Sequence, residues 1–141
     1  MSSKRIFGSA QDVESAFYEA LERSDLEAMM AVWSEDEEVV CVHPGGPRLV
    51  GYNAVREAWR RMFANGAQLS VRILQQQAVT TPFAVIHTLI ESIQIRGREG
   101  ATAPVAATNV YVRGAIGWRM VAHHASPIPP DSLVETPKVL H

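Results

Sequence analysis

The chain has 141 residues, of which 47 % are hydrophobic and 20 % charged, and its formal net charge is −2. These values are typical of one globular domain that can bury a core without disulfides or metal ions as staples. The small net charge gives no basic surface for nucleic acid or anionic membranes, so we predict neither as a partner.

The single cysteine, Cys41, excludes an intramolecular disulfide and favours a reducing compartment. Lys4 and Arg5 are not followed by an apolar run, so no signal peptide is predicted. No stretch approaches the roughly 18 apolar residues of a membrane span. We therefore expect a cytoplasmic protein.

The first half of the chain predicts three amphipathic helices, at about residues 11–23, 24–33 and 53–64. In the first helix, Val13 and Phe17 lie on the apolar face with helical spacing. This spacing places Glu14 outside that face and Tyr18 toward its flank. The ten residues before this helix show no periodicity and predict a loose leader.

Strand signals surround and follow the third helix. A short strand is expected at residues 38–43, where a Pro-Gly-Gly-Pro turn ends it. After Gly66 the apolar period changes to two, and four more strands are expected at residues 69–79, 83–96, 105–113 and 117–126. Short turns separate them, as in antiparallel hairpins. Helices grouped ahead of an antiparallel sheet indicate an α+β fold, with a ligand pocket between the two layers.

The last strand carries two adjacent histidines. Simple alternation would place Trp118, Met120, Ala122 and His124 on one face, and Arg119, Val121, His123 and Ala125 on the other. One imidazole therefore reaches the inner face in either orientation. A ring that titrates near neutral pH on a rigid strand is a candidate functional group.

Several local motifs occur in an order that resembles the NTF2-like superfamily, and within it the SnoaL-like and ketosteroid-isomerase-like proteins. They lie at Ala20–Leu26, Val40–Pro44, Gly51–Trp59, Thr108–Tyr111 and Trp118–Ser126. The resemblance covers residues 11–127, which we assign as the domain, with a flexible leader at 1–10 and a proline-rich tail at 128–141. It implies three helices packed on a curved, mainly antiparallel sheet in a cone, and a homodimer formed through the sheet.

The resemblance also suggests where isomerase chemistry would reside. The family's catalytic carboxylate, placed before the proline that ends the first strand, corresponds here to His43. Its oxyanion tyrosine corresponds to Phe17, with Tyr18 one residue along and pointing elsewhere, and its protonated acid corresponds to Asn109. One donor is lost and the base has changed, so steroid isomerisation is not predicted. A neutral His43 could still accept a proton, and Asn109 could still donate a hydrogen bond.

These observations define a candidate site. The expected catalytic residues are His43, Asn109, His123 and His124. The expected ligand-binding residues are Phe17, Tyr18, Trp33, Trp59, Phe63, His87 and Tyr111. No metal or cofactor is predicted, because adjacent strand histidines point to opposite faces and the other ligand spacings are lacking.

Two functions follow from this candidate site. The first is an apolar pocket that binds a small hydrophobic or carbonyl-bearing molecule, with isomerase-like or hydrolase/dehydratase-like proton transfer by a histidine. The alternative is a non-catalytic association domain that dimerises and keeps a vestigial pocket. The residues do not decide whether the protein is an enzyme.

Overall fold

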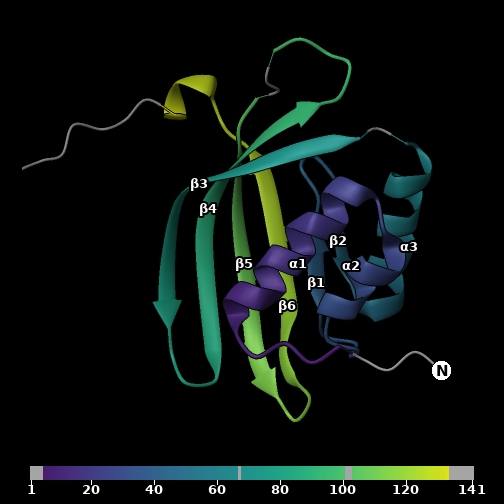
Figure 1. The fold of residues 1–141 in the computed structure, drawn as a ribbon, viewed down its shortest axis with the longest axis vertical. Coiled ribbons are helices and arrows are strands. Elements are labelled where there is room, and N and C mark those ends of the chain that lie inside the picture. Colours follow the sequence, from purple (N-terminus) through teal and green to yellow (C-terminus); the bar gives the residue numbers. More distant parts are fainter. Residues whose placement is uncertain (1–4, 67, 101–102, 134–141) are drawn as a thin grey trace, which may run out of the picture.

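The computed structural model describes residues 5–66, 68–100 and 103–133. Its helices are α1 (Ala10–Arg23), α2 (Leu26–Val32) and α3 (Tyr52–Ala64). Figure 1 shows α1 lying across one face of the long strands, with α2 and α3 gathered at the side where the two short strands lie. We call the strand face under α1 the inner face and the opposite one the outer face.

The sheet has six strands in the order β2-β1-β6-β5-β4-β3. They are β1 (Val40–Val42), β2 (Arg48–Val50), β3 (Leu69–Thr80), β4 (Ala84–Ile95), β5 (Val105–Gly114) and β6 (Gly117–Pro127). Neighbouring strands are antiparallel except β1 and β6, which are parallel. The expected α+β class and the four-strand meander are confirmed, whereas β2 was not predicted.

Helix α1 buries a wider stripe than its apolar residues alone suggest. Ser9 caps its start by accepting a hydrogen bond from the Asp12 N–H at 3.0 Å. Glu14 is only 3 % exposed and Tyr18 only 7 %. The prediction that Glu14 lies outside the buried face is therefore wrong, because α1 packs onto a curved sheet that surrounds more than one side of it.

A β-bulge in β6 changes the predicted alternation of its side chains. Val110 pairs with Ala122 while Tyr111 pairs with Met120, so Val121 is an extra residue with no partner of its own in β5. Beyond this point the inward and outward positions exchange. His123 is buried at 3 % exposure and His124 is exposed. The predicted face that joined Met120 to His124 is therefore wrong.

A second bulge lies in the edge strand β3. Leu74 pairs with Ile90 and Gln77 with Thr88, so Gln75 and Gln76 together oppose one residue of β4. Gln75 has a φ of 53°, in the left-handed region that glycine favours. The bulge turns the Gln76 side chain toward α1, where it bonds to Glu14.

The segment before α1 is anchored to the sheet. Phe7 is 2 % exposed and its carbonyl oxygen accepts a hydrogen bond from the Trp118 N–H at 3.0 Å. A Cβ at Gly117 would lie 2.7 Å from this oxygen, so the close approach requires glycine. The predicted flexible leader is wrong for residues 5–10, and residues 1–4 lie outside the described part. After β6, the 3₁₀ turn η1 (Pro130–Leu133) is described, and the rest of the predicted tail is not.

Candidate functional site

A row of polar side chains crosses the inner face of the sheet. Cys41 on β1 stands opposite His123 on β6, His123 opposite Asn109 on β5, and Asn109 opposite His87 on β4. Neighbouring strands lie about 4.8 Å apart, so these side chains are within reach of one another. Helix α1 passes over this row and presents Glu14 and Tyr18, which are four residues apart and therefore on one side of the helix.

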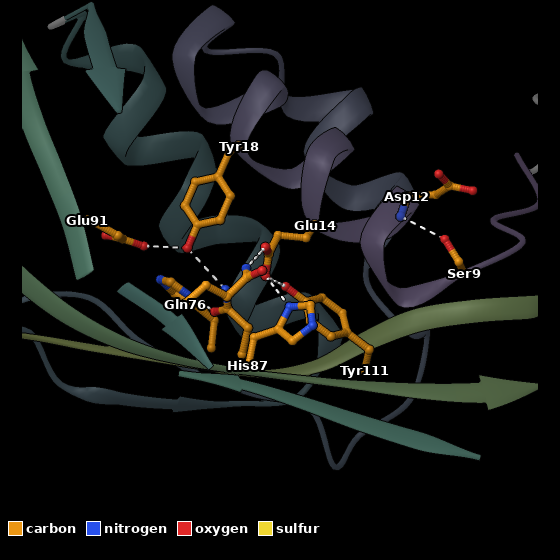
Figure 2. A network of polar contacts seen from close by, with 10 residues as sticks. Ser9, Asp12, Glu14, Tyr18, Gln76, His87, Glu91 and Tyr111 are labelled. Carbon is orange, nitrogen blue, oxygen red and sulfur yellow. Dashed lines mark hydrogen bonds and ion pairs between the residues drawn. The ribbon is translucent and has the colours of Figure 1, made fainter. Parts of the chain in front are cut away.

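Three of these groups, Tyr18, Asn109 and His123, form a continuous hydrogen-bonded chain with the buried Glu91 of β4, which we call the Glu91–His123 chain. The Tyr18 hydroxyl donates to Glu91 Oε2 at 2.7 Å, and Figure 2 shows Tyr18 reaching down from α1 toward this carboxyl group. Asn109 Nδ2 donates to the Tyr18 hydroxyl at 3.0 Å, and His123 Nδ1 lies 2.6 Å from Asn109 Oδ1. Because the Asn109 oxygen can only accept, His123 donates from Nδ1.

A second cluster surrounds Glu14. Its Oε2 atom lies 2.6 Å from His87 Nδ1 and accepts a hydrogen bond from the Tyr111 hydroxyl at 2.6 Å. Its Oε1 atom accepts a hydrogen bond from Gln76 Nε2. Figure 2 shows these side chains converging on Glu14. Three donors give a buried carboxylate the partners that its negative charge needs.

Burial changes the protonation of the Glu91–His123 chain. It raises the pKa of Glu91 to about 7, with the charge of Glu14 raising it further and the bond from Tyr18 opposing the change. Burial lowers the pKa of His123 to about 3, and positive charge on His43 or His124 would lower it further. His123 is therefore neutral near pH 7, and its Nε2 atom carries a lone pair.

Burial also keeps the two phenols neutral. It raises the pKa of Tyr18 and of Tyr111 far above the ordinary value, and the nearby carboxylates Glu91 and Glu14 add to the effect. Both hydroxyl groups therefore act as hydrogen-bond donors and acceptors across the physiological pH range.

Aromatic rings enclose the His123 end of the chain. The ring centroid of Phe17 lies 4.9 Å from that of His123, and the centroid of Trp59 lies 6.4 Å away. The ring centroid of Trp59 in turn lies 4.4 Å from that of His43 and 5.6 Å from that of Phe63. The buried Trp59 Nε1 atom has no hydrogen-bond partner in the described part of the chain. It is a donor that an oxygen atom of a ligand would satisfy.

The predicted site residues divide into three groups. Asn109, His123, Phe17, Trp59, Phe63 and His43 lie in or beside the Glu91–His123 chain, while His87 and Tyr111 belong to the Glu14 cluster. Tyr18 links Glu91 to Asn109, so the expectation that it points elsewhere is wrong. Two predicted residues lie apart from both clusters: Trp33 is buried against Met120, and His124 is exposed on the outer face. The bulge at Val121 is the reason that His124 points away.

His43, which directly follows β1, contacts Cys41 within that strand. Its Nε2 atom lies 3.4 Å from Cys41 Sγ. Burial raises the pKa of Cys41 to about 12 and lowers that of His43, so this contact joins a neutral thiol and a neutral imidazole. This bond occupies the nitrogen that a general base would use, and His43 thus serves as part of the wall around Trp59.

The sequence analysis gave none of Glu14, Gln76 and Glu91 a place in the candidate site. Period-two alternation through His87 does point Glu91 to the inner face, so this position could have been found. Glu14 has only its four-residue spacing from Tyr18 as a signal. Gln76 has none, because the bulge that turns it inward depends on pairing between β3 and β4.

The hollows that the structure describes lie elsewhere. Four of them, with volumes between about 190 and 710 Å³, are lined by residues outside the Glu91–His123 chain. None of the four is the predicted pocket between the helices and the inner face. Within the described residues, no helix has the length and apolar character to cross a membrane.

Comparisons with known proteins agree on one family. A model of the SnoaL-like domain matches residues 11–131. A Thiobacillus denitrificans protein, provisionally named a calcium/calmodulin-dependent protein kinase type II association domain, is 39 % identical, with a TM-score of 0.79 over 88 % of this chain and 98 % of its own. A Streptomyces avermitilis protein of the NTF2-like family, provisionally named a dehydratase, is 30 % identical, with a TM-score of 0.72 over 82 % of this chain and 91 % of its own.

A plant protein shares the domain in a longer chain. The F-box protein SKIP8 of Arabidopsis thaliana is 28 % identical over 116 residues, which are 81 % of this chain and 47 % of that protein. The chain thus spans about half the length of this curated relative.

Proposed function

Since the chain belongs to the SnoaL-like domain family, within the NTF2-like superfamily, we propose that it binds a small, largely apolar molecule that carries one hydroxyl or carbonyl group. The ligand lies between α3 and the inner face of the sheet, with its oxygen atom beside His123 and Trp59. The observation that carries this proposal is the Glu91–His123 chain itself, which ends among aromatic rings that include Trp59, whose buried indole N–H is unpaired in the described part of the chain.

Free energy supports a ligand at this place. An unpaired buried donor costs about 1–3 kcal/mol. Packing a core with apolar residues would avoid both that cost and the desolvation of Glu91. A ligand oxygen that accepts from Trp59 Nε1, or that bonds to His123 Nε2, recovers part of this free energy on binding.

Entry of the ligand requires α3 to move. Val55 and Trp59 are the buried residues of this helix, whereas Met62 and Phe63 are only half-buried. A helix that buries few side chains can tilt at a lower cost than α1, which buries seven residues. A small tilt of α3 moves Trp59 away from His123 and opens room between them.

If the bound molecule reacts, the same contacts supply acid–base chemistry. Burial holds the pKa of His123 at about 3, so its Nε2 lone pair takes the proton from the carbon next to a carbonyl group only as negative charge develops beside the ring, and the imidazolium then returns the proton to the product or to a leaving hydroxyl group. The bond from Nδ1 to Asn109 orients the ring for this step. The 30 % identical Streptomyces relative, provisionally named a dehydratase, makes such a reaction the first to test.

The test uses three probes with one ring system: naphthalene, 2-naphthol and 2-acetylnaphthalene. We expect saturable quenching of tryptophan fluorescence, with the two oxygen-bearing probes binding about tenfold more tightly than naphthalene because each forms one additional buried hydrogen bond. Trp59→Phe keeps an aromatic ring but removes the donor and part of the ring area, so it should weaken the binding of 2-acetylnaphthalene about tenfold more than the binding of naphthalene. Equal binding of all three probes, or no saturation, would refute the proposal.

The outer face of the sheet supports a second function, association with another copy of the chain. Val79, Ile86, Val110 and Ala122 are paired in sequence across four strands and form one apolar row. Val79 is 63 % and Ile86 38 % exposed. Burying such a row against its own copy stabilises a homodimer. The 39 % identical relative provisionally named an association domain favours this reading. A cytoplasmic location remains the prediction from the single cysteine.

A further inference from the structure

The hydrogen bonds of the Glu91–His123 chain all run in one direction, and each link can be reversed. A hydroxyl group can rotate, a side-chain amide can turn over, and an imidazole can move its proton between its two nitrogens. We infer that Glu91, which does not touch the ligand, decides whether His123 Nε2 accepts or donates a hydrogen bond, and so which class of ligand the site takes. This inference rests on the proposed binding site next to His123.

With Glu91 ionised, the carboxylate can only accept. Tyr18 therefore donates to Glu91, at 2.7 Å, and must itself accept from Asn109 Nδ2, at 3.0 Å. The Asn109 oxygen then faces His123 and accepts from Nδ1, at 2.6 Å. Nε2 is left with a lone pair, and the site favours a ligand that donates, such as an alcohol, a phenol or an enol.

With Glu91 protonated, the chain reverses. The new O–H needs an acceptor, and in the described part of the chain the Tyr18 hydroxyl is the hydrogen-bond partner of this carboxyl group. Tyr18 then turns its own proton to the Asn109 oxygen, and the Asn109 amide donates to His123 Nδ1. His123 carries its proton on Nε2, and the site favours a ligand that accepts, such as a ketone, an aldehyde or an ester.

The number of protons changes by one. Glu91 takes up one proton from solvent, while His123 loses the proton at Nδ1 and gains one at Nε2, so the imidazole stays neutral. In a mixed state, Glu91 and His123 would both donate a hydrogen bond toward the middle of the chain. Two hydrogen atoms would then face each other inside the core. The cost of such an unpaired buried contact couples the four groups.

The charged groups around the chain place the change near neutral pH. Glu91 is faced by Tyr18 and Glu14 of α1, and its charge also acts on Cys41 of β1. Burial and the negative charge of Glu14 raise the pKa of Glu91 to about 7.

The surroundings of His123 keep its ring neutral while Glu91 titrates. It is faced by Cys41 of β1 and by Asn109 of β5, while His43, which follows β1, and His124, on the outer face, act on it only through their charge when protonated. None of these side chains holds a negative charge near pH 7, because the Cys41 thiol remains protonated. No carboxylate therefore draws a second proton onto the imidazole, whose own pKa is lowered to about 3.

The direct test is the tautomer of His123 in the protein without ligand. Protein labelled with ¹⁵N-histidine and ¹³C-glutamate is titrated from pH 5 to pH 9 by nuclear magnetic resonance. We expect the two ring ¹⁵N shifts of His123 to exchange their values, from an Nε2–H form to an Nδ1–H form, with the same midpoint as the Glu91 carboxyl shift. A His123 ring that keeps one tautomer while Glu91 titrates, or a Glu91 that does not titrate in this range, would overturn the inference.

Two variants separate this coupling from a structural role. Glu91→Gln keeps the shape and removes the titration, and Tyr18→Phe keeps the ring and breaks the link. In both, the His123 tautomer should no longer depend on pH. His87, which is held by Glu14, serves as the internal control, and its shifts should be the same in Glu91→Gln as in the original protein. If the exchange at His123 persists in Glu91→Gln, Glu91 is not its cause.

Ligand preference gives the second readout. Between pH 6 and pH 8.5, the ratio of the dissociation constants of 2-acetylnaphthalene and 2-naphthol should rise about tenfold in the original protein and stay constant in Glu91→Gln. A constant ratio in both proteins would overturn the link to ligand class. A tautomer exchange without binding of any probe would instead refute the proposed binding function and leave the exchange established.

Discussion

Two carboxyl groups lie in the core of this small domain, and their surroundings give them different properties. Glu14 accepts hydrogen bonds from His87, Tyr111 and Gln76, whereas Glu91 accepts one from Tyr18. A fully bonded carboxylate stabilises the elements that supply its donors, because all of them lose a partner when it is removed. Glu14 thus joins α1 to β3, β4 and β5.

Replacing Glu14 tests this role. Glu14→Gln keeps the side-chain shape but turns an amide N–H toward groups that already donate, so we expect the free energy of unfolding in urea to fall by about 3 kcal/mol. The matched control is Glu19→Gln, the same change on the exposed side of α1, where the pair with Arg23 is 66–67 % exposed. That control should lose at most about 0.5 kcal/mol. Equal losses in the two variants would mean that the bonds to Glu14 contribute little.

Glu91 makes the free energy of unfolding depend on pH in the opposite sense to a carboxyl group whose pKa is lowered by folding. Its pKa rises from 4.5 to about 7 on folding, so the folded protein binds more protons than the unfolded chain between these values. The stability that Glu91 contributes is therefore present below pH 4.5 and is lost as the pH rises through 7. His123, with a pKa lowered from 6.5 to about 3, acts in the other direction.

The difference in the free energy of unfolding between the original protein and Glu91→Gln reports on Glu91 alone, because both proteins contain His123. Between pH 4.5 and pH 7.5, we expect the free energy of unfolding of the original protein to fall by about 3 kcal/mol relative to that of the variant. Urea unfolding at three pH values in this range measures the difference. A difference that is constant, or that grows in favour of the original protein, would show that Glu91 is not protonated in the folded core.

At the scale of elements, two bulges decide which side chains enter the core. Val121 in β6 sends His123 inward and His124 outward, and the pair Gln75 and Gln76 in β3 brings an amide to Glu14. One extra residue exchanges the faces of every position that follows it. In this sheet the bulges therefore determine which polar side chains point into the core.

The bulge in β3 carries a backbone cost that glycine would relieve. Gln75 has a φ of 53°, which a side chain disfavours, so Gln75→Gly should raise the free energy of unfolding by about 0.5–1 kcal/mol. Gln77→Gly, two residues along the same exposed strand but in extended backbone, should instead lower it by about 0.5–1 kcal/mol. Thermal and urea unfolding of the two variants give the comparison, and losses of the same size would contradict a strained residue at position 75.

At the scale of the whole molecule, the described residues cover one face of the sheet and leave the other face uncovered. The inner face lies under α1 (Figure 1), while the outer face presents the row of Val79, Ile86, Val110 and Ala122. Apolar side chains that are paired across strands form one continuous surface, unlike scattered exposed residues. A second copy of the chain is the partner we propose for it.

Charge placed in this row tests the dimer. We expect light scattering to give the mass of two chains for the original protein and of one chain for Ile86→Lys, because a lysine at the centre of the contact cannot be desolvated. Ile116→Lys introduces the same charge at an isoleucine that is 47 % exposed in the turn between β5 and β6, beyond the end of the row, and should leave the mass unchanged. Circular dichroism establishes that both variants are folded. A mass of one chain for the original protein at high concentration would refute the association.

Local pattern determined much of this protein. The 3.6-residue period of the first half and the two-residue period after Gly66 predicted the three helices and four long strands, because burying one face of an element requires only that its own residues be spaced correctly. Phe17 and Trp59 were placed on the inner side of their helices for the same reason, whereas Asn109 entered the candidate site through the family resemblance, and His123 and His124 were both kept as candidates.

The tertiary structure alone decided how the polar groups meet. The choice of His123 over His124 depends on one unpaired residue in β6, and the inward position of Glu14 depends on how deeply α1 sits on the curved sheet. Both are outcomes of strand pairing and packing between segments far apart in the sequence. A periodic pattern determines which face of an element is apolar, but only its neighbours determine which polar side chains that face also buries.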